Sequence, residues 1–229
     1  SQVYWIGQIS GLIGLIDNHN ISGEDISKLY VDGAEDKENY RAIREHVLVG
    51  LSKHNNIALV VPGHPRLGVT IVQEFEKLAK DSQIDLTVYP GISSFDAMIN
   101  DIGLDPLEEG TCIVDANRLI LFNYTMDTAL NYYIYHVCSI GNTKTDYLAP
   151  QTRNRVSFLK EKLLQHYSED HNAVLLSAVT QVGEQPDKIL GTVGDLDSLF
   201  QKVSFKHSLF IPQITPDRSR INWEFLKLI

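Results

Sequence analysis

An apolar run that ends in a rigid turn constrains this chain most. Ile57–Val61 (IALVV) is apolar throughout, which is typical of a strand covered on both faces of a parallel sheet. Pro62–Gly68 (PGHPRLG) follows directly, and Val69–Lys80 then repeats apolar residues at helical spacing. The two prolines fix the backbone around Gly63 and His64, and the glycine permits close approach to the main chain. The pattern predicts a strand, a loop and a helix. A ligand could lie against that loop, although a tight turn without a ligand is the alternative.

The same order recurs through the first half of the chain. We expect Ser93 or Ser94 to cap one of its helices, and Gly103 to end that helix. Alternating strands and helices favour a parallel sheet with helices on its faces, and they place the loops after two of its strands on one edge. The expected strands are Val3–Ile6, Ile57–Val61 and Leu86–Tyr89, and the expected helices are Lys37–His54, Val69–Lys80 and Ser93–Ile102.

The second half has longer apolar strands and fewer repeating units. Its expected elements are strands at Asn131–Cys138, Ala173–Val179 and Ser208–Ile211, and an amphipathic helix at Arg155–Tyr167. The predicted fold is therefore α/β and two-lobed. An N-terminal lobe with a parallel sheet spans residues 1–123, and a C-terminal mixed-sheet lobe spans residues 124–229.

Charge and cysteine content narrow the function classes. The 229 residues carry a net charge of −9, which disfavours nucleic acid as a general partner. Cys112 and Cys138 lie outside any metal-ligand spacing and indicate a reducing compartment such as the cytoplasm. The histidines form no metal-binding pair on a helix, and no apolar run is long enough to span a membrane. We therefore expect no metal, no nucleic acid and no membrane association.

Two loops about thirty residues apart resemble a known family. The loop Pro62–Pro65 (PGHP) and the loop Tyr89–Ser94 (YPGISS) are similar to the G-[DH]-P and P-G-[IVM]-S-[SA] loops of tetrapyrrole methylases, the class III methyltransferases. In that family the two loops together hold S-adenosylmethionine. The resemblance implies this cofactor here, with the second lobe closing over it. The implied cofactor-binding residues are Pro62, Gly63, His64, Val69, Ser93, Ser94, Val137, Ala178 and Pro212.

Three further stretches resemble one branch of that family, the borosin-type enzymes that N-methylate peptide backbone amides. They are Glu109–Ala116 (EGTCIVDA), Asn131–Gly141 and His207–Pro212 (HSLFIP). The resemblance implies a peptide substrate. The family's first glycine-rich strand has no counterpart here, since Gly7 and Gly11 lie too close to Pro62. We therefore expect that residues are missing ahead of Ser1.

Two of the four catalytic positions of the borosin pattern carry the expected residue type. Tyr30 and Tyr40 fall where active-site tyrosines are expected, although Tyr40 could equally be a core residue of an amphipathic helix. At the position where the pattern has an arginine, this chain has Asp36, and at the position of the tyrosine in Y-G-H-P it has Pro62. Lys37 could supply the positive charge but not the forked geometry of arginine.

These departures leave two other functions open. One is a methyltransferase for a tetrapyrrole or another small molecule, and the other is a catalytically silent binding module like the methylase-like domain of MazG-type proteins. The family resemblance also implies a homodimer. The sequence supports that dimer only through an aromatic strand and an apolar tail, whose residues are Tyr132, Tyr133, Tyr135, Trp223, Phe225, Leu226 and Leu228.

Overall fold

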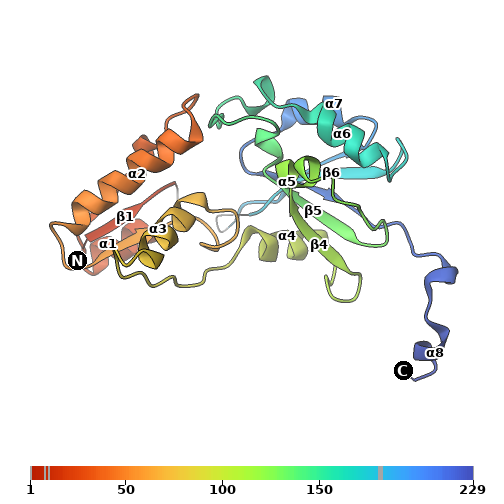
Figure 1. The fold of residues 1–229 in the computed structure, drawn as a ribbon, viewed down its shortest axis with the longest axis horizontal. Coiled ribbons are helices and arrows are strands. Elements are labelled where there is room, and N and C mark those ends of the chain that lie inside the picture. The colour runs from red at the N-terminus through yellow and green to blue at the C-terminus, as the bar shows by residue number, and fades with distance from the viewer. Residues whose placement is uncertain (1, 8, 10, 180–182, 229) are drawn as a thin grey trace.

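Two separate sheets, each with its own helices, lie side by side along the long axis of the molecule (Figure 1). The structure is a computed structural model that describes residues 2–7, 9, 11–179 and 183–228. We call the part around the first sheet the first lobe and the part around the second sheet the second lobe. Among the described residues, no helix is both long and apolar enough to cross a membrane.

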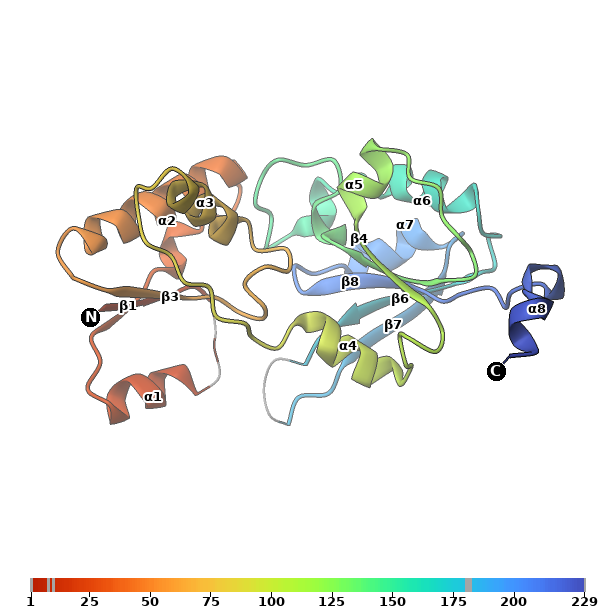
Figure 2. The same cartoon turned by 60° about the horizontal axis from the view of Figure 1, so that its bottom comes forward.

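The first sheet has three parallel strands in the order β2-β1-β3. Helices α2 and α3 cover one face of the sheet, and α1 lies on the other side (Figure 2). Its core is apolar and is centred on Ile26, Ile43 and Phe75. The elements are β1 (Gln2–Trp5), α1 (Leu12–Asn18), β2 (Gly23–Asp25), a 3-10 turn (Ser27–Leu29), α2 (Asp36–Leu51), β3 (Ile57–Val60) and α3 (Thr70–Lys80).

The second sheet has five strands in the order β4-β5-β8-β6-β7. Strands β4 and β5 are parallel, whereas the other neighbouring pairs are antiparallel, so the sheet is mixed as predicted. Its strands are β4 (Thr111–Asp115), β5 (Asn131–Tyr135), β6 (Asn172–Ser177), β7 (Asp187–Thr192) and β8 (His207–Ile211). Its helices are α4 (Ser94–Ile102), α5 (Ala116–Leu121), α6 (Val156–Leu164) and α7 (Leu196–Leu199), with 3-10 turns at Val137–Ser139, Pro150–Thr152 and Phe200–Lys202. A tail with a 3-10 turn (Arg218–Arg220) and α8 (Trp223–Leu226) extends away from the lobe (Figure 1).

The alternation along β5 distributes its side chains over two cores. Tyr132 and Ile134 pack on the side of α5, α6 and α7, whereas Tyr133 and Tyr135 pack on the side of α4. A strand that continued to Cys138 would place Val137 on the face of Tyr133, but Val137 packs with Tyr132 and Ile134 instead. The strand ends at Tyr135 because His136 adopts a left-handed backbone with φ of 55°, which breaks the alternation.

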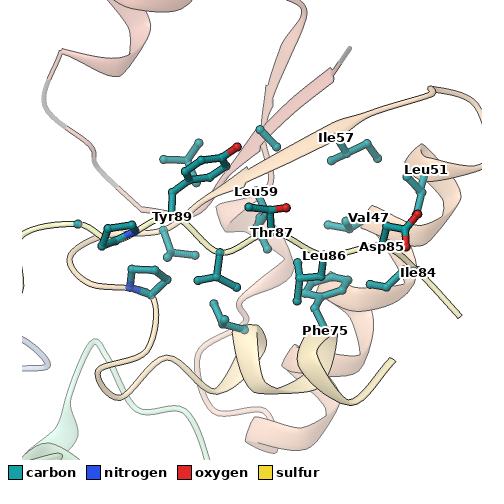
Figure 3. Close-up of a pocket in the computed structure, with 18 of the residues that line it drawn as sticks. Val47, Leu51, Ile57, Leu59, Phe75, Ile84, Asp85, Leu86, Thr87 and Tyr89 are labelled. Atoms are coloured by element: carbon teal, nitrogen blue, oxygen red, sulfur yellow. The ribbon is translucent and has the colours of Figure 1, made fainter. Parts of the chain in front are cut away.

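The predicted strand at Leu86–Tyr89 is wrong, because these described residues pair with no neighbour. A cavity of about 460 Å³ separates their segment from β3, and Leu86, Thr87 and Tyr89 face it across from Ile57 and Leu59 (Figure 3). Helices α2 and α3 also contribute to its mostly apolar wall. The residues alternate as a strand should, but a strand also needs a hydrogen-bonded neighbour.

The chain passes from the first sheet to the second before the predicted boundary at residues 123–124. Strand β4 already pairs with β5 along its whole length, and α4 packs through Met98 against Tyr133 and Phe210. The first sheet ends at β3, so residues from α4 onward belong to the second lobe. The sequence missed this because Thr111–Asp115 lacks a long apolar run, and its strand forms through pairing with β5.

Candidate functional site

The two loops singled out in the sequence meet in the structure, as predicted. A side-chain carbon added at Gly91 would lie 2.7 Å from the carbonyl oxygen of Gly63 and 3.9 Å from Cα of His64. Gly63 itself has a φ of +77°, which favours glycine. The two main chains can therefore approach this closely only because Gly91 has no side chain.

A capped helix fixes the second loop. Ser93 is the N-cap of α4, and its side chain accepts from the amide of Asp96 while the Asp96 carboxylate accepts from the amide of Ser93 at 2.6 Å. Ser94, the next residue, places its hydroxyl 3.0 Å from the hydroxyl of Tyr135 on β5. Both predicted caps of this helix are confirmed, since Gly103 ends it in the left-handed conformation.

The two tyrosines expected from the sequence lie side by side in the first lobe. The hydroxyl groups of Tyr30 and Tyr40 are 3.4 Å apart, and both rings are half-buried. Burial, together with the neighbouring Tyr40, raises the pKa of Tyr30 well above its usual value. The Tyr30 phenol therefore stays protonated and can donate to an oxygen atom.

A segment of the second lobe, residues 142–148, lies along residues 31–39 of the first lobe; we call it the strap. The amide of Gly33 donates to the carbonyl of Thr145, and the amide of Thr145 donates to the carbonyl of Ala34. The buried amide of Asn39 donates to the Thr145 hydroxyl at 2.9 Å, and that hydroxyl donates to Asp36. Asp36, which stands where the borosin pattern has an arginine, thus makes a hydrogen bond between the two lobes.

The strap also brings aromatic side chains to Tyr30. Its ring stacks on Tyr147 with centroids 6.4 Å apart and meets Phe205 edge-on at 6.3 Å. Tyr147 and Phe205 remain 40% and 43% exposed, and Leu148 beside them is 74% exposed. The hydroxyl pair therefore lies next to an exposed apolar surface built from both lobes.

Sequence reasoning missed a histidine–carboxylate pair at the carboxyl ends of β4 and β5. Nδ1 of His136 lies 2.6 Å from Oδ2 of Asp115, and the two side chains are 43% and 26% exposed. The imidazole also lies against the first lobe, since Nε2 would be 3.0 Å from a side-chain carbon at Gly68. The hydrogen bond from Asp115 raises the pKa of His136, and a backbone hydrogen bond at Gly68 and the charge of Asp36 act in the same direction. The sequence signal that could have revealed this pair is a carboxylate and a histidine at the ends of two strands that pair in parallel.

The structure does not bring together all of the predicted cofactor residues. Val69 precedes α3 and packs in the first-lobe core, and Ala178 packs near Tyr135 at the His136 end of the second sheet. Val137 is fully buried in the second-lobe core. Pro212 follows Ile211, which pairs with Tyr132, so it lies at the end of the sheet where β5 begins, away from His136. The residues around the loop contact are Pro62, Gly63, His64, Ser93 and Ser94.

The exposed surface beside the loops is apolar. Tyr89 and Ile92, which flank Pro90 and Gly91, are 78% and 80% exposed. Nothing lies within 3.8 Å of a side-chain carbon placed on Gly63, and the nearest atom is the Ile92 carbonyl oxygen at 3.9 Å. The loops thus offer exposed main chain and apolar surface to a ligand. No group of three or more His, Cys, Asp or Glu among the described residues could hold a metal ion.

The Gly63 loop follows the carboxyl end of β3, and the Gly91 loop leads into α4 of the second lobe. A glycine loop at a strand end that meets a second loop in this way is typical of sites for nucleotide-type ligands in α/β proteins. The family model of the Tetrapyrrole (Corrin/Porphyrin) Methylases matches residues 23–197. The chain belongs to this family, as the two loops predicted. Its fold is similar to uroporphyrin-III C-methyltransferase of Thermus thermophilus complexed with S-adenyl homocysteine, with a TM-score of 0.58 over 92% of this chain and 84% of the other at 12% identity. The methyltransferase CobJ gives a TM-score of 0.56 over 95% and 84% at 9% identity.

Relatives by sequence carry the borosin name. A methyltransferase and type II borosin cyclic peptide precursor of Phlebiopsis gigantea is 24% identical over 84% of this chain and 34% of its own length. A type I counterpart of Coprinopsis marcescibilis is 23% identical over 89% and 53%. A type III counterpart of Anomoporia bombycina is 28% identical over 69% and 18%. The chain thus spans between about a fifth and about half of these relatives' lengths.

Proposed function

We propose that this protein is an S-adenosylmethionine-dependent methyltransferase that N-methylates backbone amides of a peptide. The observation that carries the proposal is the contact between the Gly63 and Gly91 loops. It fits a flat, partly apolar cofactor, because exposed main chain and the exposed Tyr89 and Ile92 side chains lie on the same surface. The borosin relatives support the choice of a peptide as acceptor.

Pro62, Gly63, His64, Ser93 and Ser94 are the residues that would hold the cofactor. When bound, S-adenosylmethionine supplies a methyl group on a positively charged sulfur. The rest of the site has to prepare a poor nucleophile, because the lone pair of an amide nitrogen is delocalised into its carbonyl. A donor to the carbonyl oxygen stabilises the charge that develops there as the nitrogen reacts. Tyr30, which stays protonated, can be that donor, and Tyr40 holds its hydroxyl in place.

The exposed aromatic surface supports a peptide acceptor with apolar side chains. Tyr147 and Phe205 lie beside Tyr30, so a peptide whose amide reaches Tyr30 would place neighbouring side chains on these rings. Aromatic surface stabilises such contacts through apolar burial. A negative net charge of −9 further favours a neutral or basic peptide over an acidic one.

We further propose a homodimer. The tail residues Trp223, Phe225, Leu226 and Leu228 are 47% to 80% exposed, and α8 makes an apolar projection beyond the second lobe (Figure 1). Contact with a second copy would cover this surface. Sedimentation of the chain and of a version truncated after residue 217 tests it: a dimer that the truncation dissociates is expected, and a monomer at micromolar concentration contradicts it.

Two measurements test the activity. Calorimetric titration with S-adenosylhomocysteine should show binding, and its absence contradicts the proposal. Mass spectrometry of short blocked peptides of valine, isoleucine and glycine, incubated with enzyme and S-adenosylmethionine, should show gains of one methylene mass on backbone nitrogen. Tyr40→Phe should strongly reduce the gain while leaving cofactor binding intact.

The same assay separates the other functions. Turnover of uroporphyrinogen III with no gain on any peptide would replace the peptide acceptor by a tetrapyrrole. Cofactor binding without transfer to either acceptor would indicate a silent binding module.

A further inference from the structure

We propose that His136, held by Asp115, is the cationic group where the second lobe meets Gly68, and that it donates a hydrogen bond to the carbonyl oxygen of the amide that is methylated. This inference rests on the proposed methyltransferase function and names a catalytic residue for it. The borosin pattern has an arginine at the position on α2 where this chain has Asp36. His136 would supply the positive charge that this arginine supplies in the pattern.

The geometry of His136 is that of a residue held for a task rather than for packing. It is one of four non-glycine residues with positive φ among those described, and a left-handed backbone is unfavourable for a residue with a side chain. Its neighbours on either side, Tyr135 and Val137, are packed in two different cores. The backbone turn at His136 thus lifts its side chain out of both cores, and 43% of that side chain remains exposed.

The partners of the ring fix which groups it presents. Asp115 ends β4 directly beside the end of β5, and its carboxylate accepts from Nδ1 of His136. The same carboxylate caps α5 by accepting from the amide of Arg118 at 2.8 Å, so it cannot swing away freely. The other ring nitrogen, Nε2, lies against Gly68 at the end of the Pro62–Gly68 loop. A carboxylate on one nitrogen leaves the proton on the other available to a substrate oxygen.

The charges around the ring favour the imidazolium form. Asp115 from β4 and Asp36 from α2 both raise the pKa of His136, and the Gly68 backbone does the same, while burial opposes them. Tyr135, whose ring lies 6.5 Å from the imidazole, is a further titratable neighbour on β5. The charge of Asp36 also raises the pKa of Tyr30, so Asp36 favours the protonated forms of both Tyr30 and His136.

The cluster offers the two groups that amide methylation needs. Tyr30 is a neutral donor and His136 is a charged one, and the charge of Asp36, which accepts from Thr145 of the strap, raises the pKa of both. Lys37, the other candidate cation, is exposed to solvent on α2. Nε2 lies against the backbone of Gly68, and the amide oxygen of a bound peptide would take that place.

Three variants test this role. His136→Asn keeps a residue that tolerates the left-handed backbone but removes the charge. Asp115→Asn keeps the cap on α5, because asparagine also caps helices, but removes the carboxylate that stabilises the imidazolium. His19→Gln, an exposed histidine after α1, is the matched control.

Methyl transfer to the valine, isoleucine and glycine peptides gives the kinetic readout, and titration with S-adenosylhomocysteine gives the binding readout. His136→Asn should lower kcat by about 100-fold or more, as loss of one oxyanion donor does. Its affinity for S-adenosylhomocysteine should be unchanged, and His19→Gln should match the unaltered enzyme. The kcat of the unaltered enzyme should fall as pH rises through the pKa of His136, and in Asp115→Asn that fall should move to lower pH.

If His136 has only a structural role, kcat should fall at the same pH in Asp115→Asn as in the unaltered enzyme. That result overturns the proposal. Full activity of His136→Asn on a peptide that the unaltered enzyme methylates overturns it as well, while leaving the proposed function intact. If the unaltered enzyme binds S-adenosylhomocysteine but methylates no peptide, the proposed peptide activity itself fails, and the role of His136 with it.

Discussion

Replacing Gly91 by alanine tests the contact on which the cofactor site depends. The new methyl group would lie 2.7 Å from the carbonyl oxygen of Gly63 and 3.6 Å from its carbonyl carbon, both main-chain atoms that no side-chain rotation can move. Ordinary contact begins near 3.4 Å, so the two loops must separate by about 0.7 Å. Gly91 has no positive φ, so the effect is steric rather than conformational.

Overpacking of this size costs about 1–3 kcal/mol where the surroundings are rigid. Both loops are exposed and can move apart, so we expect the lower end of that range in the free energy of unfolding. We expect a larger loss in the free energy of cofactor binding, because the cofactor site requires both loops at once. A loss of about 1.4 kcal/mol in binding would weaken the affinity for S-adenosylhomocysteine about tenfold.

Calorimetric titration with S-adenosylhomocysteine measures the affinity, and thermal unfolding measures the fold. Gly14→Ala is the matched control, since a side-chain carbon there meets nothing within 4 Å and an alanine suits the interior of α1. A folded Gly91→Ala protein that binds S-adenosylhomocysteine as tightly as the unaltered protein would refute the assignment of these two loops to the cofactor.

Three further variants test the structure around the site. Ser93→Ala removes the cap of α4 and should lower the free energy of unfolding by about 1 kcal/mol in urea titrations, whereas no change would contradict the capping box. Asn39→Ala leaves Val31 and Thr145 without their buried partner, and we expect a loss of about 2 kcal/mol by the same measurement; a loss within error would show that the strap does not depend on it. Burial lowers the pKa of His207, whose Nδ1 accepts from the amide of Ser204 at 2.9 Å. The folded protein should therefore lose stability as pH falls below ~6.5, where the unfolded state takes up a proton first, and His207→Gln should lose less over that interval; equal losses would exclude His207 as the cause.

Local patterns determined much of the fold. The apolar run at Ile57–Val61, the helical spacing in α2 and α3 and the Ser93 and Gly103 caps each depend on neighbours a few residues away, and the structure has them where they were expected. The two glycine loops were also recognised from their resemblance to the family, and they meet as expected, although only the Gly63 loop follows a strand of the sheet. The family followed from those loops.

Tertiary structure decided what depends on pairing between distant segments. Leu86–Tyr89 has the alternation of a strand, yet it lines a cavity and pairs with no neighbour, whereas Thr111–Asp115, which was not predicted as a strand, forms one through pairing with β5. The site divides in the same way. Tyr30 and Tyr40 were singled out by their match to the borosin pattern. The hydrogen bond between His136 and Asp115, in contrast, joins residues 21 apart, and the one between Asp36 and Thr145 joins residues 109 apart. Such contacts leave no periodic trace in the sequence, because they are made by the packing of two lobes and not by any local preference of the backbone.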